Sequence, residues 1–409
     1  MKILSFGSCN TDLVYRLPHI TKTGETNRAE TLDTFPGGKG LNQSVAIARA
    51  GLAVYHAGKI GRDGGFLLDF MRDAGISTEY VGISGRPTGH AVIQVDDDGN
   101  NAIFVLNGAN FDITRKEIDG VLSGFSAGDI ITVQNEISEI PYLISAAAGR
   151  GMRVFYNPSP VGRVTASVNL SDVSCLIVNE VEAHCFADFT VEGEFFRLMH
   201  EKYPELAVLL TLGSRGSMYF SDGEIICAPA YLVDAVDTTA AGDTFTGYFI
   251  ASCARGIDKR MSLKIASAAA ALAVSRRGAA SSIPTTDEVS AGMSRMTHRP
   301  AGDSFEERFL RYIDSHLADA SLDGAARELG YSNASVGKII KDKTGRTFSD
   351  VLTARRCEVA AERLLSSDLP IGEIIAGVGY RNESFFRRTF FEKYHKTPTE
   401  YRRQRRLQS

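Results

Sequence analysis

The sequence predicts a layered α/β domain with a mainly parallel sheet, followed by a separate all-α domain. Through the first 285 residues, short β-rich runs alternate with stretches of helical period, which is typical of helices packed on a parallel sheet. This alternation ends around residues 292–304, where Gly292, Pro300 and Gly302 interrupt the pattern. Beyond that segment every periodic stretch is helical. A chain of 409 residues is also too long for one compact core, so two domains are expected.

The elements of the first domain are predicted from their apolar runs and turn residues. An apolar strand over 2–7 enters a Gly-Ser turn, and a helix over 42–50 stops at Gly51. Residues 89–95 and 101–106 alternate on both sides of an Asp-Gly turn at 96–99, which indicates a β-hairpin and therefore a small extra sheet. Further strands are expected at 55–60, 130–133, 154–156, 175–178 and 208–212.

The net charge changes sign along the chain. The whole sequence carries −4, but from Pro300 onward there are 19 Lys and Arg against 16 Asp and Glu. From Arg381 onward nine basic residues face three acidic ones. A basic end on a neutral-to-acidic body predicts a tail that faces nucleic acid or a membrane. We place the first domain at 1–292, a linker at 293–304 and the second domain at 305–409.

Neither a metal-binding cysteine pattern nor a membrane segment is expected. The six cysteines are scattered without a C-x-x-C pair, which favours reduced thiols in a cytoplasmic protein. The N-terminal segment is too short and too quickly polar for a signal peptide. The longest apolar run, over 265–274, is far shorter than the roughly 20 residues that a membrane helix needs.

The second domain contains an internal repeat. The segment LGYSNAS at 329–335 recurs as VGYRNES at 378–384, and each copy lies between two helical stretches. Helix, glycine-containing turn and helix form the helix-turn-helix pattern, so the domain is predicted to contain two of them.

Three glycine-containing segments of the first domain are candidates for chemistry. GGKGLN at 37–42 precedes a helix, a weak signal when taken alone. TLGSRG at 211–216 leaves an apolar strand and fits a nucleotide loop or an ordinary turn equally well. DTTAAGDTF at 237–245 opens a helix, whose exposed amides would bind phosphate. Within it, Asp243 is expected to be a base for a substrate hydroxyl, with a helix cap as the alternative.

Together these segments resemble the ribokinase/PfkB family of sugar kinases, over residues 1 to about 290. NPSP at 157–160 also resembles a family signature, and N-x-x-E at 179–182 matches the motif that organises Mg²⁺ and phosphate. The resemblance implies that Asp243 is the catalytic base. It implies sugar contacts from Asn10, Asp12, Gly38, Lys39, Asn42, Glu136 and Asp243. The implied ATP contacts are Asn179, Glu182, Thr211, Gly213, Ser214, Arg215, Gly216, Ala241, Gly242 and Ser267.

The same resemblance implies two cations and a lid. Mg²⁺ would bridge the ATP phosphates, and K⁺ would lie beside the anion hole. The predicted hairpin would close over the sugar and exclude water. Many family members have Gly where this chain has Ala240. Ribokinases commonly have Ala at this position, so the difference indicates that subfamily. The implied K⁺ positions are Asp237, Thr239, Ala273, Arg276, Gly278 and Ser282, mostly through backbone carbonyls.

The duplicated unit resembles the AraC/XylS family of bacterial transcription regulators, over residues 305 to about 405. Its closing TPTEYR at 397–402 matches that family's terminal signature. The resemblance implies two recognition helices for double-stranded DNA, at 333–344 and 383–393. The candidate DNA contacts are Lys338, Lys341, Arg387 and Arg388, with Phe386, Phe390 and Phe385 directed inward.

These resemblances leave three functions open. The chain is a bifunctional sugar kinase and transcription regulator, or a sugar sensor with weak catalysis, or an enzyme whose DNA-binding tail is decaying. The intact Asp243, Asn179 and Glu182 favour the first. Ribose is the expected sugar, ahead of deoxyribose, other pentoses, fructose or a nucleoside. A homodimer is a further expectation.

Overall fold

A computed structural model describes residues 1–96, 100–189, 191–297, 305–329, 331, 333–344, 346–367, 369–380 and 382–403. The chain divides into two compact units, Met1–Ala301 and Gly302–Ser409, which are described separately. Several predicted features lie outside the described residues: the tip of the hairpin at 97–99, the linker from 298 to 304, Gly330, Ser332, Gly345 and Arg381 of the repeats, and the basic residues Arg405 and Arg406. Within the described ranges, no helix has both the length and the apolarity to cross a membrane.

The first unit is built on a nine-stranded sheet with the order β13-β12-β11-β10-β9-β8-β1-β4-β5. Pairing is parallel from β5 to β11 and antiparallel for the last two strands. Strand order reverses between β1 and β8, which is where ligands bind in open parallel sheets. The strands are β1 (Ile3–Phe6), β4 (Tyr55–Ile60), β5 (Ser77–Ile83), β8 (Ile130–Gln134), β9 (Arg153–Asn157), β10 (Cys175–Asn179), β11 (Ala207–Thr211), β12 (Ser217–Ser221) and β13 (Glu224–Ala228).

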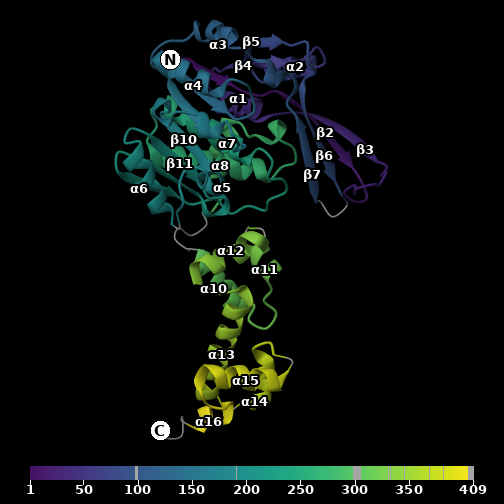
Figure 1. The fold of residues 1–409 in the computed structure, drawn as a ribbon, viewed down its shortest axis with the longest axis vertical. Helices are drawn as coiled ribbons and strands as arrows, with labels where there is room; N and C mark the ends of the chain where they lie inside the picture. The colour runs from purple at the N-terminus through teal and green to yellow at the C-terminus, as the bar shows by residue number, and fades with distance from the viewer. Residues whose placement is uncertain are drawn as a thin grey trace. The chain divides into compact units, whose positions relative to one another are not determined.

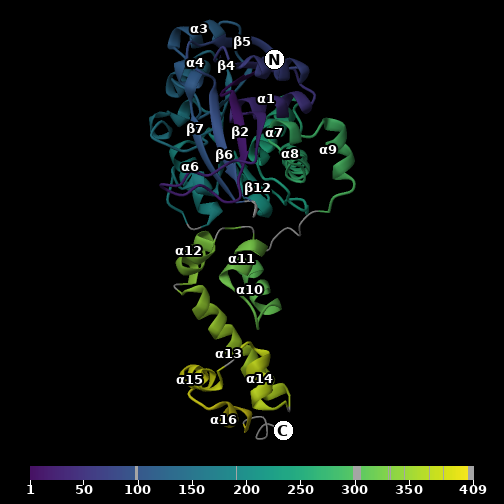
Figure 2. The same ribbon diagram turned by 90° about the vertical axis from the view of Figure 1, so that its right-hand side faces the viewer.

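Helices cover both faces of this sheet, so its central strands are buried on each side. Figure 2 shows α1, α7 and α8 on one side, and α3, α4 and α6 on the other. The helices are α1 (Lys39–Arg49), α2 (Gly65–Asp73), α3 (Arg115–Leu122), α4 (Ile140–Gly149), α5 (Glu180–Ala183), α6 (Glu192–Lys202), α7 (Ala241–Ala254), α8 (Lys259–Val274) and α9 (Thr286–Met293), with 3₁₀ turns η1 (Gly108–Asp112), η2 (Thr165–Ser167), η3 (Leu170–Asp172), η4 (Gly213–Arg215) and η5 (Ala280–Ser282).

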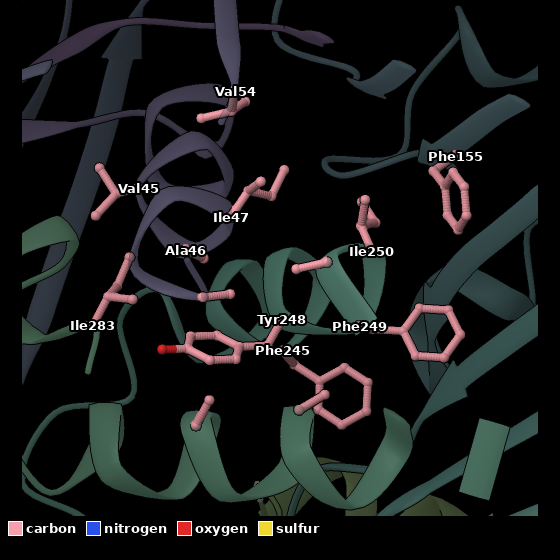
Figure 3. Close-up of a cluster of buried hydrophobic side chains, with 14 of the residues drawn as sticks. Val45, Ala46, Ile47, Val54, Phe155, Phe245, Tyr248, Phe249, Ile250 and Ile283 are labelled. Atoms are coloured by element: carbon pink, nitrogen blue, oxygen red, sulfur yellow. The ribbon is translucent and has the colours of Figure 1, made fainter. Parts of the chain in front are cut away.

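The contact between α1 and α7 is the part of this core that matters most for the site. Ile47 of α1 belongs to the same apolar cluster as Tyr248, Phe249 and Ile250 of α7 (Figure 3). The helices approach closely because Gly247 faces α1: a Cβ at that position would lie 2.4 Å from Ala46 Cβ. This close packing brings together two helix beginnings that are 202 positions apart in sequence, at Lys39 and Ala241.

A second, four-stranded sheet stands apart from the main one, in the order β3-β2-β6-β7 (Figure 1). Its strands are β2 (Asn10–Arg16), β3 (Thr31–Gly37), β6 (Gly89–Val95) and β7 (Asn101–Leu106). The predicted hairpin is confirmed as β6 and β7, which pair antiparallel from His90 opposite Leu106 to Val95 opposite Asn101. The extra sheet is larger than the hairpin predicted, because β2 and β3 double it.

In the part of the second unit that the structure describes, the regular elements are all helices, as predicted, and they enclose an apolar core of their own. Helix α13 is started by a capping box between Thr347 and Asp350. Gly379 has φ 87° in the second turn, and a Cβ there would lie 2.5 Å from the Ala318 carbonyl oxygen. The helices are α10 (Phe305–Ser315), α11 (Leu322–Leu329), α12 (Asn333–Thr344), α13 (Phe348–Ser366), α14 (Ile371–Gly377), α15 (Glu383–Tyr394) and α16 (Pro398–Arg403).

Candidate active site and DNA-binding helices

Polar side chains gather at the carboxyl ends of adjacent parallel strands. Asn10 follows β1, Glu136 follows β8, Asn157 ends β9 and Asn179 ends β10. The carboxyl ends of parallel strands share one edge of a sheet, which is where α/β folds place their ligand sites. The beginnings of α1 and α7 complete the group.

Helix α7 begins without a side-chain cap. Its N-cap residue, Ala240, is in the left-handed region with φ 59° and makes no side-chain capping hydrogen bond. A left-handed alanine costs about 1–2 kcal/mol, so the surrounding structure imposes this turn. Gly242 has no atom within 4 Å of the place where a Cβ would stand. The Ala241 N–H already donates to the Thr238 carbonyl at 3.3 Å, so an anion at this uncapped helix start would meet the amides of Gly242 and Asp243.

Asp243 does not cap the helix, contrary to the alternative reading of the sequence. Its carboxylate is buried and turns toward α1. Oδ2 accepts a hydrogen bond from Asn42 Nδ2 at 3.0 Å, and Oδ1 accepts one from Gln43 Nε2 at 3.2 Å. The oxygen of the Asn42 side-chain amide, Oδ1, is buried and has no hydrogen-bond partner among the described residues. A donor group on a ligand would satisfy it.

Lys39 lies among three carboxylates. Its pKa is raised by Asp243 most strongly, and by Glu136 and Glu182, against the opposing effect of burial. The backbone N–H of Lys39 donates to Glu136 Oε2 at 2.9 Å, and Ser8 Oγ donates to the same oxygen. Burial raises the pKa of Glu136, and the charge of Lys39 opposes that shift. The structure thus brings Lys39, Asn42, Glu136 and Asp243 together, as the resemblance implied.

Asn10 and Asp12 lie at the start of β2, opposite the glycines that precede α1. Asn10 pairs with Gly37 and Asp12 with Phe35. A Cβ at Gly37 would stand 2.1 Å from Asp12 Oδ2, so only glycine leaves room for this carboxylate. Burial, together with the nearby charge of Glu136, raises the pKa of Asp12 to about 7. Gly38, with φ 93°, is the N-cap of α1.

Asn110 is a site residue that the sequence analysis missed. Its Nδ2 donates to Asn10 Oδ1 at 2.7 Å, and its Oδ1 accepts from the Cys9 N–H at 3.0 Å. It therefore fixes the segment that carries Asn10. The contact joins residues 100 positions apart, and no local pattern around Asn110 signals it. Gln43 and Ser8 were missed for the same reason.

The N-x-x-E segment forms a capping box at the end of β10. Asn179 Oδ1 accepts from the Glu182 N–H at 2.8 Å, and Glu182 Oε2 accepts from the Asn179 N–H at 3.0 Å. Both side chains therefore have a structural role. Glu182 is buried beside the charge of Lys39, so the motif also presents a carboxylate to the site. A carboxylate oxygen in this place suits Mg²⁺.

The segment 211–216 forms a tight turn after β11. Gly213 has φ 55° and Gly216 has φ 103°, so both positions favour glycine. The guanidinium of Arg215 bonds to Glu180, next to Asn179, and to Glu192 Oε1 at 2.7 Å. Arg215 thus ties this turn to the N-x-x-E segment. Ser267 of α8 is buried, and its hydroxyl donates to the Pro229 carbonyl at 3.3 Å.

The loops that the resemblance assigned to K⁺ are joined through Asp237. Its Oδ1 accepts from the Thr239 N–H at 2.9 Å, and its Oδ2 accepts from the Gly278 N–H at 3.0 Å. The carbonyl of Ala273 already accepts from the Arg276 N–H at 3.1 Å. In the described parts of the chain, no three His, Cys, Asp or Glu side chains gather as a metal site. A cation here would be held by Asp237 and carbonyl oxygens, which suits a large monovalent ion.

The candidate DNA-binding side chains lie on the surfaces of α12 and α15. Lys338 and Lys341 are exposed on α12. Arg387 is 3.3 Å from Glu383, and Arg388 lies 5.3 Å from the ring centroid of Phe385. Phe386 and Phe390 are fully buried, as predicted. The inward direction expected for Phe385 is wrong: this ring is 46% exposed, because α15 presents it on the same face as Arg388.

Comparison with known proteins identifies both parts of the chain. Residues 1–286 match the profile of the pfkB family of carbohydrate kinases, and residues 325–404 match that of a helix-turn-helix domain. The ribokinase of Bacillus subtilis is 34% identical over 295 residues, covering 70% of this chain and 97% of its own length. The ribokinase of Schizosaccharomyces pombe is 35% identical over 308 residues, covering 71% and 96%.

Solved structures agree with these matches. The ribokinase of Thermotoga maritima superposes with a TM-score of 0.65 at 32% identity, over 72% of this chain and all of that one. The Arabidopsis thaliana ribokinase in complex with ribose and ATP gives 0.63 at 30% identity, over 71% of this chain and 98% of that one. Fold, site and comparisons agree: the chain belongs to the pfkB family of carbohydrate kinases, as an ATP-dependent enzyme to which a helix-turn-helix domain is joined.

Proposed function

We propose that this chain phosphorylates ribose at its terminal hydroxyl, giving ribose 5-phosphate, and that it binds specific DNA sequences as a transcription regulator. One observation carries the catalytic half. Asp243 is a buried carboxylate held by Asn42 and Gln43 in the first turn of α7, a helix that begins without a side-chain cap and so suits an anion. A base beside a phosphate site is what transfer of a phosphoryl group to a hydroxyl requires.

Ribose is proposed for two reasons. The relatives compared above are named ribokinase, and the Arabidopsis structure holds ribose and ATP. The site also suits a compact polyol, because it offers carboxylates at Asp12 and Glu136 and amides at Asn10 and Asn42 within one small region. Another pentose, fructose or a nucleoside remains the alternative substrate.

The residues of the chain have separate tasks in the reaction. Asp243 takes the proton of the attacking hydroxyl, while Asn42 keeps that carboxylate in place. The amides of Gly242 and Asp243 would stabilise the charge that develops on the transferred group, while that of Ala241 already donates to the Thr238 carbonyl. Lys39 adds a positive charge between the carboxylates. Bound ATP supplies the phosphoryl group and Mg²⁺ neutralises its phosphates, with Asn179 and Glu182 as the residues that would hold the ion.

We place the nucleotide over the turn at 211–216 and the neighbouring segment of α8. The predicted contacts Thr211, Gly213, Ser214, Arg215, Gly216 and Ser267 all belong to these two elements. Arg215 acts mainly by holding the turn, since two carboxylates already engage its guanidinium. K⁺ would lie between the loops that Asp237 joins, and its charge would support the anion site at α7.

The four-stranded sheet is proposed as a lid over the sugar. It carries Asn10 and Asp12, and its strand β7 exposes Ile103, Phe104 and Leu106. Successive residues of a strand point to opposite faces, so both faces of β7 are apolar. One face would close on the sugar and exclude water. The other face, with the unpaired edge of β7, would pair with a second copy of the chain in a homodimer.

For the second unit we propose DNA binding by α12 and α15. The exposed Lys338 and Lys341 would meet phosphates, and Arg387 and Arg388 would face base edges of the major groove. We place the domain boundaries at 292 and 305, and the working compartment in the cytoplasm, where ATP and DNA are both available. A sugar sensor with weak catalysis is the alternative role for the first unit.

The fusion becomes a regulator only if the two units are coupled. Closing a lid gives the first unit two states between which a ligand selects. We expect sugar or ATP to change DNA affinity by about 5–150-fold, the usual coupling of about 1–3 kcal/mol, and linkage requires the reciprocal change. The test selects a duplex from a random library with the full chain and titrates it at fixed salt, with and without ribose and a nonhydrolysable ATP analogue. Identical curves would show two independent units.

A further inference from the structure

We propose that Gln43 is a positioning residue for the catalytic base, a role separate from sugar binding. The proposal rests on Asp243 being that base. Gln43 Nε2 donates to Asp243 Oδ1 at 3.2 Å and also to Asn157 Oδ1 at 3.2 Å. Asn42 holds the other carboxylate oxygen but has a buried acceptor left over for a ligand. In Gln43, by contrast, both the amide nitrogen and the amide oxygen form hydrogen bonds with other residues of the protein.

The direction of the Gln43 amide is fixed by its other end. Its Oε1 accepts from Thr132 Oγ1 at 2.8 Å and from Gln134 Nε2 at 2.6 Å, both in β8. Turning the amide over would place its NH₂ group against the Gln134 NH₂ group, and its oxygen against the Asp243 carboxylate. Two acceptors or two donors facing each other lose their hydrogen bonds inside a buried site. The NH₂ group of Gln43 therefore always faces Asp243.

The network continues across the sheet and makes this orientation rigid. Asn157 of β9 donates a hydrogen bond from its Nδ2 to the Ile177 carbonyl of β10, at 3.0 Å. Gln43 and Thr132 are fully buried, and Asn157 is 9% exposed. Three parallel strands thus fix one amide, which fixes one oxygen of the base. Of these side chains, Gln134 leaves its Oε1 without a hydrogen-bond partner among the described residues. Buried hydrogen-bonded networks hold a geometry with little reorganisation, which is the property that a catalytic carboxylate needs.

This arrangement assigns Gln43 a selective effect on the chemical step. Displacing a reacting group by about 1 Å can reduce the rate by about 10²-fold, while ground-state contacts of the substrate persist. The sugar would still meet Asn10, Asp12 and Glu136 when Gln43 is changed. We therefore expect a loss in kcat without a matching change in the KM for sugar.

The experiment compares Gln43→Met and Gln43→Glu with the parent in the full-length protein. Gln43→Met is expected to lower kcat by about 10–100-fold and to change the sugar KM by less than about threefold. Gln43→Glu would put a second carboxylate beside Asp243, and like charges resist ionisation. Its kcat should therefore rise only at higher pH than that of the parent. Lys39, Glu136 and Glu182 are also charged groups of this site, but they are present in both the parent and Gln43→Glu. The difference between the two pH profiles of kcat therefore reports the new carboxylate.

Two further variants separate positioning from loss of stability. Thr132→Val removes one donor that orients the Gln43 amide, so it should lower kcat in the same direction but by less. Tyr156→Phe removes a buried hydrogen bond to Asn135 at 2.7 Å outside this network, so it should lower Tm and leave kcat unchanged. Thermal melts of all variants show which of them fold.

The outcomes distinguish the inference from the proposed function. If folded Gln43→Met and Gln43→Glu turn over within twofold of the parent while Asp243→Asn is inactive, Gln43 does not position the base and the base remains. If Asp243→Asn is itself active, the proposed function is wrong. If kcat and sugar KM change together in Gln43→Met, Gln43 acts on sugar binding and the inference is overturned.

Discussion

Asn42 donates a hydrogen bond to Asp243 across 201 positions of sequence, from the first turn of α1 to the first turn of α7. The bond can form because the two helices pack closely at Gly247 of α7. This residue has no side chain, so Ala46 of α1 can approach the α7 backbone. One apolar contact in the core therefore decides where the candidate base stands. The Asn42–Asp243 pair therefore links the packing of α1 against α7 to the position of the candidate base.

Asp243→Asn should preserve the fold and sugar binding and lower turnover by about 10²–10⁴-fold, as expected for loss of a general base. An amide of the same shape fits between Asn42 and Gln43 but cannot take a proton. Its NH₂ group would face one of their two donors, so a thermal melt is measured beside the activity. Coupled assay of ADP release, with sugar affinity by calorimetry, measures both quantities. Turnover within a few-fold of the parent would exclude Asp243 as the base.

Sugar affinity should fall as pH drops below 7, because Asp12 has a pKa near 7 and its ionised form is the stronger acceptor for sugar hydroxyls. The raised pKa also means that the folded state binds more protons than the unfolded state between the two pKa values. The contribution of Asp12 to the free energy of unfolding therefore falls as the pH rises from about 4 to about 7.

Asp12→Asn is the test of both effects. It should flatten the pH dependence of sugar affinity between 6 and 8, measured by calorimetry, and it should raise Tm at pH 8 relative to the parent. Gly37→Ala is a useful companion, because its Cβ would press on the Asp12 carboxylate. A pH dependence of affinity that is unchanged in Asp12→Asn would assign it to another group.

Replacing K⁺ with Na⁺ or choline should lower kcat, since the loops joined by Asp237 resemble a monovalent cation site. Asp237→Asn should weaken the response to K⁺, because its carboxylate holds Thr239 and Gly278 in register. Activity is titrated against each chloride salt at constant ionic strength. Equal activity in all three salts would rule out this ion.

Arg387→Ala and Arg388→Ala should each weaken specific DNA binding by about 5–150-fold, corresponding to about 1–3 kcal/mol for an arginine that reads a base. Lys338→Ala should weaken binding to all sequences alike and reduce the salt dependence. Lys393→Ala is the matched control on α15, because its amine bonds to Ala354 and Glu358 of α13. Equal losses in Lys393→Ala and Arg388→Ala would indicate damage to the helix instead of lost DNA contacts.

Sequence patterns predicted the strands that are buried on both faces, because these are continuous apolar runs. The strands missed were those with mixed faces, such as β2 and β3 of the second sheet. The turn at Asp222-Gly223 between β12 and β13, with φ 53° and 79°, is an Asp-Gly hairpin signal, although these two strands were not predicted. Helix α1 starts three residues earlier than expected, at Lys39.

For the site, local motifs identified Asp243 and Lys39 but not the residues that hold them. Gln43 and Asn110 act through partners that lie 89 to 200 positions away, and only the fold brings these side chains together. The exposed ring of Phe385 was misplaced for a related reason. The helical period leaves a position at the edge of the buried face undecided, and packing against the neighbouring helices decides it.

The central claim is that this chain, with its DNA-binding unit attached, is a ribose kinase. The direct measurement is ATP turnover by the full-length protein with Mg²⁺ and K⁺ against ribose, deoxyribose, other pentoses, fructose and a nucleoside, with the product identified by mass spectrometry and ³¹P NMR. We predict the highest kcat/KM for ribose, with ribose 5-phosphate as product, a lower value for deoxyribose because it lacks one hydroxyl, and no turnover in Asp243→Asn. Absence of phosphorylation of every sugar by the folded parent protein, or equal rates in Asp243→Asn, would contradict the claim.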